Sequence, residues 1–169
     1  MQKELIIFIG HPAGGKSSAA KQLAKELGDG VYIGVDEIKI QISGSVFSRT
    51  PDEKELWFKE INRQIKQGLK EHRAVVVDEG FFTNELLQKI LVGLEEIDFK
   101  RLIIEVTFDL EEHLRRNTER GDAPEPVRHM YKIWNSVPLD ERIKPDIEIH
   151  DKTLTTQQIV DTILSKLNP

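Results

Sequence analysis

The chain has 169 residues, of which 38% are hydrophobic and 31% are charged, a balance that fits one folded domain and excludes a disordered chain. Its 29 acidic and 24 basic residues give a formal net charge of −5, which disfavours nucleic acid as a partner but leaves room for a local basic cleft. The absence of cysteine excludes disulfides and thiolate chemistry.

Two strands and two helices are predicted in the first half of the chain. Short apolar runs predict the strands, and apolar residues that recur every three or four positions predict the helices. A glycine after the first helix and a capping box with proline before the second mark their ends. In chain order we predict a strand at Leu5–Ile9, a helix at Ser17–Leu27, a strand at Val31–Val35 and a helix from Thr50 to about Glu71.

The second half continues the alternation of strands and helices, which predicts a parallel sheet covered by helices on both faces. Residues Gly121–Lys144 are rich in proline and charge, so we expect this segment to be the most mobile. The predicted elements are strands at Ala74–Val77, Leu102–Phe108 and Ile147–Ile149, and helices at Thr83–Ile97, Asp109–Arg120 and Thr155–Leu167.

A phosphate-binding loop is the most specific signal in the sequence. The segment GHPAGGKS matches the pattern G-x-x-x-x-G-K-[ST] between a predicted strand and a predicted helix, although a chance glycine-rich turn is the alternative. Such a loop points backbone N–H groups at phosphates, its lysine reaches the β- and γ-phosphates, and its serine binds Mg²⁺. The predicted contacts to a nucleoside triphosphate are Gly10, His11, Pro12, Ala13, Gly14, Gly15, Lys16 and Ser17.

Two acids are expected at the edge of the sheet where ligands of open parallel sheets bind. Asp36 follows the strand Val31–Val35, and Asp78 follows the strand Ala74–Val77. We predict that Asp78 supports Mg²⁺, directly or through water, unless it caps a helix or a turn. We predict that Asp36 orients an acceptor hydroxyl and accepts its proton, the alternative being an N-cap of a helix that starts at Glu37.

The residues that follow Asp78 allow two interpretations. The pair Asp78-Glu79 resembles the acids of hydrolytic ATPases, in which the glutamate polarises water. Because the chain lacks space for the extra helical domain of such ATPases, we favour Glu79 as a solvated residue at the rim. Phe81 and Phe82 follow closely enough that one of them could line an acceptor pocket.

An arginine pair lies on the predicted helix Asp109–Arg120. Arg116 and Arg120 are four residues apart and therefore share one face, from which they could cover the phosphates and stabilise the charge in transfer. Arg128 could join them. The alternative is ordinary surface pairing, for instance between Glu112 and Arg116.

The five histidines show no spacing typical of metal ligands. His11 lies inside the phosphate loop, where we expect it to pack against the loop or face solvent rather than to take part in catalysis.

Taken together, these motifs resemble the small P-loop kinases related to adenylate, gluconate and shikimate kinases. Within them, the chain is most similar to the subgroup that includes chloramphenicol phosphotransferase, zeta toxins and the polynucleotide 5′-kinase domain. The resemblance covers most of the chain and rests on Gly10–Ser17, Val35-Asp36, Val75–Asp78, Arg116 with Arg120, and the final strand and helix.

This resemblance implies an α/β, three-layer P-loop NTPase fold, with a five-stranded parallel sheet of order 2-3-1-4-5, helices on both faces and a small lid. Residues 1–169 would form one kinase domain with a mobile lid around residues 110–144. ATP and Mg²⁺ would be the cofactors and a hydroxyl group the acceptor. Asp36 would correspond to the general base, with Lys16, Arg116 and Arg120 as the other catalytic residues.

Three functions stay open at this point. The first is phosphotransfer from ATP to a hydroxyl of a small molecule, and the second is an ATPase or regulatory protein without an acceptor. The third is a kinase of nucleic-acid 5′ ends, which needs a basic channel. Its candidate residues, between which acids are interspersed, are Lys39, Arg49, Lys54, Arg63 and Lys66.

No membrane partner is expected, since no run approaches the roughly 18–20 apolar residues that a membrane helix needs. The first residues lead into a strand without a signal-peptide pattern. We therefore expect a cytoplasmic protein, either a monomer or a homodimer.

Overall fold

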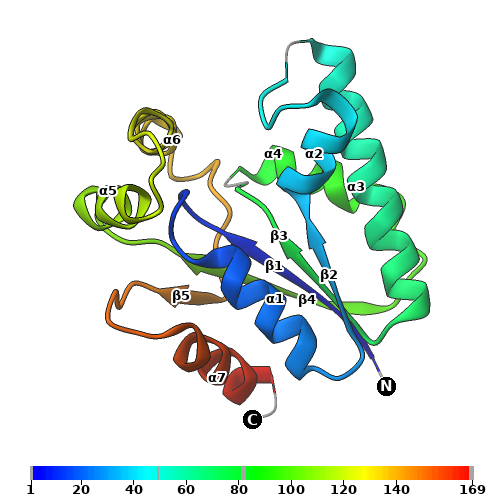
Figure 1. The fold of residues 1–169 in the computed structure, drawn as a ribbon. Helices are drawn as coiled ribbons and strands as arrows, with labels where there is room; N and C mark the ends of the chain where they lie inside the picture. Colours follow the sequence, from blue (N-terminus) through cyan, green and yellow to red (C-terminus); the bar gives the residue numbers. More distant parts are fainter. Residues whose placement is uncertain (1, 49, 81–82, 168–169) are drawn as a thin grey trace.

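The computed structural model describes residues 2–48, 50–80 and 83–167, and it shows a parallel sheet with helices on both faces (Figure 1). Five strands pair in the order β2-β3-β1-β4-β5, and every pairing is parallel. The predicted three-layer fold with strand order 2-3-1-4-5 is thus confirmed. The strands are β1 (Lys3–Ile9), β2 (Gly30–Gly34), β3 (Ala74–Asp78), β4 (Phe99–Val106) and β5 (Ile147–Ile149).

Helices connect the strands and close the chain. Across the described residues, none of them is long and apolar enough to cross a membrane. The helices are α1 (Lys16–Glu26), α2 (Val35–Ser43), α3 (Pro51–Glu71), α4 (Asn84–Leu91), α5 (Leu110–Glu119), α6 (Glu125–Ser136) and α7 (Thr156–Leu167).

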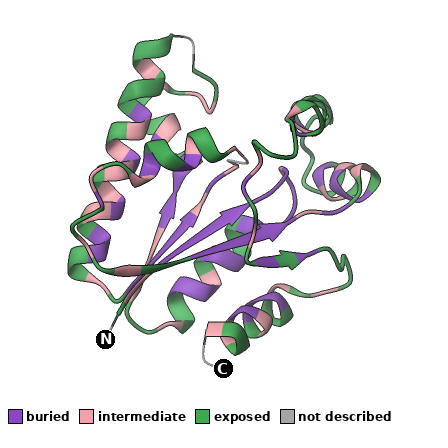
Figure 2. Cartoon of the chain, turned by 180° about the vertical axis from the view of Figure 1, so that it is seen from behind, coloured by how far each residue is buried: buried purple, intermediate pink, exposed green. Residues whose placement is uncertain are grey.

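Both faces of the sheet are buried, and Figure 2 shows the central strands as the most buried part of the chain. Side chains alternate between the faces of a strand, so a strand covered on both sides must be apolar throughout. Ile7 and Ile103 belong to the core formed with α3 and α4, whereas Phe8 and Ile104 belong to the core formed with α1 and α7. These two cores fix the strands whose ends carry the candidate site.

Helix α3 has the start and the end that the sequence predicts. The Thr50 hydroxyl accepts a hydrogen bond from the Glu53 backbone N–H at 3.2 Å, and Pro51 takes the first helical position, where no N–H is needed. The apolar side chains that recur every four residues are buried against the sheet: Trp57, Ile61, Ile65 and Leu69.

Helix α4 is shorter than predicted, because it ends at Leu91 rather than at Ile97. Gly93 has a φ of +75°, a left-handed conformation that a glycine adopts without steric cost and that stops the helix. Leu94 still reaches the core from the turn that follows, where its N–H donates to the Leu91 carbonyl oxygen. Leu94 is therefore buried at the position that a longer helix would give it, which explains why the sequence pattern predicted a helix beyond Leu91.

Helix α6 lies inside the stretch for which no element was predicted. Pro124 and Pro126 fall before and inside its first turn, where the missing N–H groups leave no hydrogen bond unmade. Val127 and Trp134, seven residues apart, are its buried side chains. Helix α6 packs against α5, and both lie beyond the strands beside the loop that joins β1 to α1 (Figure 1).

Candidate active site

The turn between β1 and α1 has a backbone that demands glycine at two positions. Gly10 has a φ of +134°, and a Cβ there would lie 2.1 Å from the carbonyl oxygen of Val106 in β4. Gly15 has a φ of +86° and precedes the first turn of α1. Ala13, at a φ of +60°, is the one non-glycine residue with a positive φ in the described chain. The glycine-rich segment thus forms a tight turn pressed against the end of β4.

Lys16 folds back over this turn. Its Nζ donates to the backbone carbonyl oxygen of His11 at 2.8 Å, and the residue is only 9% exposed. Burial lowers the pKa of Lys16, while the nearby carboxylates of Asp78, Asp36 and Glu79 oppose that shift. The lysine charge is therefore held at the mouth of the turn among acids, and Ser17 lies exposed beside it.

Asp78 lies where the sequence places it, as the last residue of β3. The Tyr32 hydroxyl donates to its Oδ2 at 3.4 Å, and this acid contributes to raising the pKa of Tyr32, a shift caused chiefly by burial. The position of Asp36 in the fold differs from the expected one, because β2 ends at Gly34 and α2 begins at Val35. Asp36 thus lies in the first turn of α2 with an exposed carboxylate that is neither at the strand end nor an N-cap.

Lys39 joins Asp36 to Glu79, a connection that the sequence analysis missed. Its Nζ lies 3.4 Å from Asp36 Oδ1 and 3.1 Å from Glu79 Oε1. The lysine comes one helical turn after Asp36, and this spacing was the available signal. The pair of acids is therefore held by one ammonium group on α2.

Glu79 is buried rather than solvated, so its interpretation as a residue of the rim is wrong. It is 3% exposed, and burial raises its pKa to about 7, although Lys39 opposes the shift. Its Oε2 has no hydrogen-bond partner among the described residues. Phe81 and Phe82, expected near an acceptor pocket, lie outside the residues that the structure describes.

Arg116 lies next to the phosphate-loop turn. A Cβ at Gly15 would be 3.8 Å from Arg116 Nη1, and the guanidinium stands 4.3 Å from the centre of the Phe108 ring. The surface pairing weighed as an alternative is also present, since Arg116 Nε donates to Glu112 Oε1 at 2.5 Å. Its Nη2 donates to the Lys152 carbonyl oxygen at 2.9 Å. Arg116 is thus both adjacent to the turn and anchored.

Arg120 and Arg128, the other arginines considered for contact with the phosphates, are exposed. Arg120 reaches the electrostatic surroundings of Lys16 and contributes to lowering its pKa. Arg128 lies exposed on α6.

Two buried histidines lie where the turn meets α5 and α6: His11 belongs to the turn itself, and His113 belongs to α5. His11 Nδ1 lies 2.6 Å from Thr107 Oγ1, and its ring centre is 4.6 Å from that of Tyr131. His113 Nε2 accepts a hydrogen bond from the Phe108 N–H at 2.9 Å. Burial lowers the pKa of His11 to about 3 and that of His113 to about 4. Both rings are consequently neutral at physiological pH and act as packing groups.

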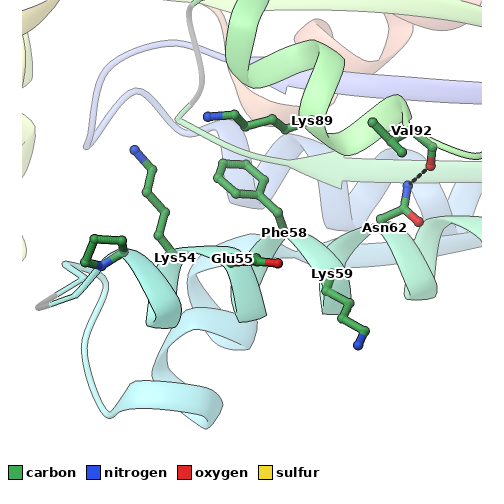
Figure 3. A pocket seen from close by; sticks show the side chains of 8 residues that line it. Lys54, Glu55, Phe58, Lys59, Asn62, Lys89 and Val92 are labelled. Carbon is green, nitrogen blue, oxygen red and sulfur yellow. Dashed lines mark hydrogen bonds between the residues drawn. The ribbon is translucent and has the colours of Figure 1, made fainter.

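A cavity lies away from this turn, on the outer side of α3 and α4 (Figure 3). It has a volume of about 760 Å³, and Lys54 and Lys89 extend from its two helices on the same side as the Phe58 ring, while Lys59 points away. Of the residues considered for a basic channel, Lys54 lines it, Arg63 is paired with Glu60, and Arg49 falls outside the described chain. The complete lining is Pro51, Lys54, Glu55, Phe58, Lys59, Asn62, Lys89 and Val92.

A glycine-rich turn and lysine between the central strand and its helix, in a parallel sheet of order 2-3-1-4-5, define a P-loop protein of the small-kinase type. More particularly, the chain belongs to the AAA_33 family, described as an AAA domain, whose model matches residues 5–131.

Similar proteins include both a curated relative and solved structures. L-seryl-tRNA(Sec) kinase of Methanococcus maripaludis is 27% identical over 139 residues, which are 78% of this chain and 52% of that protein, so the chain spans about half the length of this relative. A gluconokinase from Sinorhizobium meliloti superposes with a TM-score of 0.67 at 16% identity, over 97% of this chain and 91% of that one. Shikimate kinase from Acinetobacter baumannii gives 0.64 at 13% identity, over 98% and 93%.

The first prediction concerns the turn itself. Gly10→Ala should lower the free energy of unfolding by about 2–4 kcal/mol, because the added Cβ meets the Val106 carbonyl oxygen and the backbone conformation is strained. Urea unfolding measures the change. Gly80→Ala is the matched control, since a Cβ there meets no heavy atom within 4 Å. Equal midpoints for the two variants would contradict the geometry of the turn.

The second prediction is a dependence of stability on pH. The pKa values of His11 and His113 are lower in the folded state than the usual 6.5, so the unfolded chain binds more protons as pH falls from 6.5 towards 4. Each histidine then removes up to about 1.4 kcal/mol of stability per pH unit. Glu79 acts in the opposite sense, because its pKa is raised from 4.5 to about 7. As pH falls through this range, the folded chain binds more protons than the unfolded chain, so Glu79 adds to the stability of the fold.

The contribution of His113 is isolated by comparison with a variant. His113→Gln should make the loss of stability per pH unit smaller by up to about 1.4 kcal/mol between pH 6.5 and 4, whatever its stability at pH 7. Denaturant unfolding at several pH values gives both slopes. His129→Gln, which changes an exposed histidine, should leave the slope unaltered. Identical slopes for wild type and His113→Gln would rule out a buried neutral His113.

Proposed function

We propose that this chain is an ATP-dependent phosphotransferase that moves the γ-phosphate of ATP to a hydroxyl group of a small-molecule acceptor. One observation carries the proposal: the exposed carboxylate of Asp36 is close enough to Lys16, the lysine of the phosphate loop, for its charge to oppose the lowering of the Lys16 pKa. A carboxylate that stays accessible beside the phosphate-binding lysine is the group that phosphotransfer to a hydroxyl requires.

The triphosphate would be held by the backbone of the turn and by Lys16. The positive φ values at Gly10, Ala13 and Gly15 curl the backbone, and α1 adds the positive end of its dipole. In the proposed complex, Lys16 exchanges the His11 carbonyl oxygen for β- and γ-phosphate oxygens.

Ser17 and Asp78 fit the hard-oxygen preference of Mg²⁺, since they offer a hydroxyl in the first turn of α1 and a carboxylate at the end of β3. When bound, Mg²⁺ supplies neutralisation of the charge on the phosphates. Among the described residues, the hydrogen bond to the Asp78 carboxylate is the long one from the Tyr32 hydroxyl to Oδ2, so its oxygens are available for ligation or for water.

Asp36 would act as the general base of the transfer. The acceptor hydroxyl gives its proton to the Asp36 carboxylate, its oxygen forms the new bond to the γ-phosphorus, and the bond to the β-phosphate oxygen breaks to release ADP. Lys39 restrains Asp36 through Oδ1, which leaves Oδ2 for the acceptor. The arginines Arg116 and Arg120 would then stabilise the charge on the transferred group.

Residues 110–144 would form the lid of a single domain that spans residues 1–169. Two observations support this proposal. Helices α5 and α6 pack against each other beyond the strand ends, and Tyr131 of α6 contacts His11 of the loop. A segment that touches the phosphate loop through one aromatic cluster is suited to close over bound nucleotide and exclude water.

Phosphotransfer is favoured over simple ATP hydrolysis by the position of Glu79. A glutamate that polarises water must reach that water, whereas Glu79 is buried and its Oε1 is held by Lys39 at 3.1 Å. A hydroxyl acceptor attached to nucleic acid is the second candidate, and the similarity to L-seryl-tRNA(Sec) kinase favours it.

The third prediction tests the proposed activity. Purified protein with Mg·ATP should phosphorylate at least one compound in a panel of sugars, nucleosides, amino alcohols, aminoacyl-RNA and oligonucleotides, measured as transfer of labelled γ-phosphate. Lys16→Ala should abolish the transfer and most ATP affinity while the thermal unfolding midpoint stays close to that of wild type. ATP turnover that no hydroxyl compound stimulates would instead support an ATPase or regulatory protein.

The fourth prediction concerns the general base. Asp36→Asn should lower acceptor phosphorylation by roughly 10²–10⁴-fold while ATP affinity changes little, because the amide cannot take the proton. Glu37→Gln is the matched control, since Glu37 is the next residue of α2 and pairs with Lys21 at the surface. If the two variants lose activity equally, Asp36 is not the base.

A further inference from the structure

A second cluster of ligating side chains lies on the edge of the sheet formed by β4 and β5. Glu105 of β4 is paired directly with Glu148 of β5, and His150 follows two residues after Glu148. Their carboxylate and imidazole ligand atoms all lie within 4.8 Å of one another. None of these residues belongs to the phosphate loop or to the group formed by Asp36, Lys39 and Glu79.

Glu105 is the unusual member of this cluster. It is 9% exposed, and across the described residues its carboxylate makes no hydrogen bond and no ion pair. It also stands opposite Glu148 on the neighbouring strand, an arrangement in which like charges repel. A buried carboxylate in this position calls for a cation.

His150 is oriented so that one ring nitrogen faces the two acids. Its Nδ1 lies 3.2 Å from the Thr107 backbone carbonyl oxygen, which can only accept a hydrogen bond, so Nδ1 carries the proton. Nε2 lies 3.0 Å from Glu148 Oε2. If the ring is protonated, Nε2 donates to Glu148 Oε2; in the neutral ring both of these atoms are acceptors, and a metal ion between them takes the place of that proton. A backbone carbonyl behind the ring is the usual outer partner of a histidine that ligates a metal.

We propose that Glu105, Glu148 and His150 bind one divalent transition-metal ion of the Zn²⁺ type. One imidazole nitrogen with two carboxylates suits Zn²⁺, and it suits Mg²⁺ poorly because that ion prefers an oxygen-only octahedral shell. Metal–ligand bonds of about 2.0–2.2 Å place ligand atoms about 3.4 Å apart in a tetrahedral site. The exposed side chains of Glu148 and His150 close the remaining separation by rotation.

Such an ion would fasten a short edge strand. Only three residue pairs join β4 to β5, and His150 begins the loop that leads to α7. Thr107, whose carbonyl faces His150, also contacts His11 of the phosphate loop through its hydroxyl. The site would therefore stabilise the sheet edge beside the nucleotide site, and it stands independently of the proposed phosphotransfer.

The test is a titration of metal-stripped, untagged protein with Zn²⁺ by calorimetry, and with Co²⁺ by its visible absorption. Wild type should bind one equivalent of Zn²⁺ with a rise in the thermal unfolding midpoint, also in the presence of Mg·ATP. Glu148→Gln and His150→Gln should each weaken binding at least about tenfold. Glu111→Gln and His129→Gln, which change exposed residues of the same types on α5 and α6, should bind as wild type does.

Each other result overturns the proposal. Zn²⁺ binding that persists unchanged in both Glu148→Gln and His150→Gln places the ion elsewhere, and binding that Mg·ATP displaces assigns it to the phosphate loop. No binding by wild type means that the proton on His150 is the only cation there. Because Glu148 and His150 are exposed, these variants decide the question even if Glu105→Gln fails to fold.

Discussion

The close approach of the β1–α1 turn to the end of β4 is the constraint on which the candidate site depends. Gly10 leaves no space for a Cβ, because the Val106 carbonyl oxygen occupies that position. Strand β1 is the centre of the sheet and is paired on both sides, so the turn starts from the most firmly held strand. A phosphate site built from backbone N–H groups needs such rigidity, since its donors cannot be reoriented one at a time.

The buried ion pair between Lys39 and Glu79 is not expected to add much to the stability of the fold. Removing water from two charges costs several kcal/mol per ion, and apolar residues of similar volume often stabilise a fold as well or better. The pair has a clearer consequence for geometry, because Lys39 also holds Asp36 at the entrance of the site. The ion pair thus holds Lys39 in place, and Lys39 in turn restrains Asp36, the proposed base, relative to the phosphate loop. Phosphotransfer depends on such positioning.

The fold could be predicted from local patterns, and the details of the site could not. Apolar strands, capping residues and the glycine-lysine motif are encoded in neighbouring residues, so the parallel sheet and the long helix α3 followed from the sequence, whereas the strand order was implied by the resemblance to small P-loop kinases. Burial of Glu79 depends on Lys39 and α2, which pack over it from a distant part of the chain. Helix α6 was missed because its composition is that of a loop. Its prolines lie at the start of the helix and its charged residues lie on the exposed face.

Arg116 of α5 and Arg120, the residue after the end of this helix, differ in the contacts that each would lose on binding a phosphate. Arg116 would have to leave the Glu112 carboxylate, the Lys152 carbonyl oxygen and the face of Phe108. Because charged hydrogen bonds are strong, a phosphate gains from Arg116 only the difference between new and old partners. Arg120 is exposed and already lies in the field of Lys16. The geometry therefore favours Arg120 as the proposed contact to the transferred phosphate, with Arg116 as the residue that fixes α5 beside Gly15.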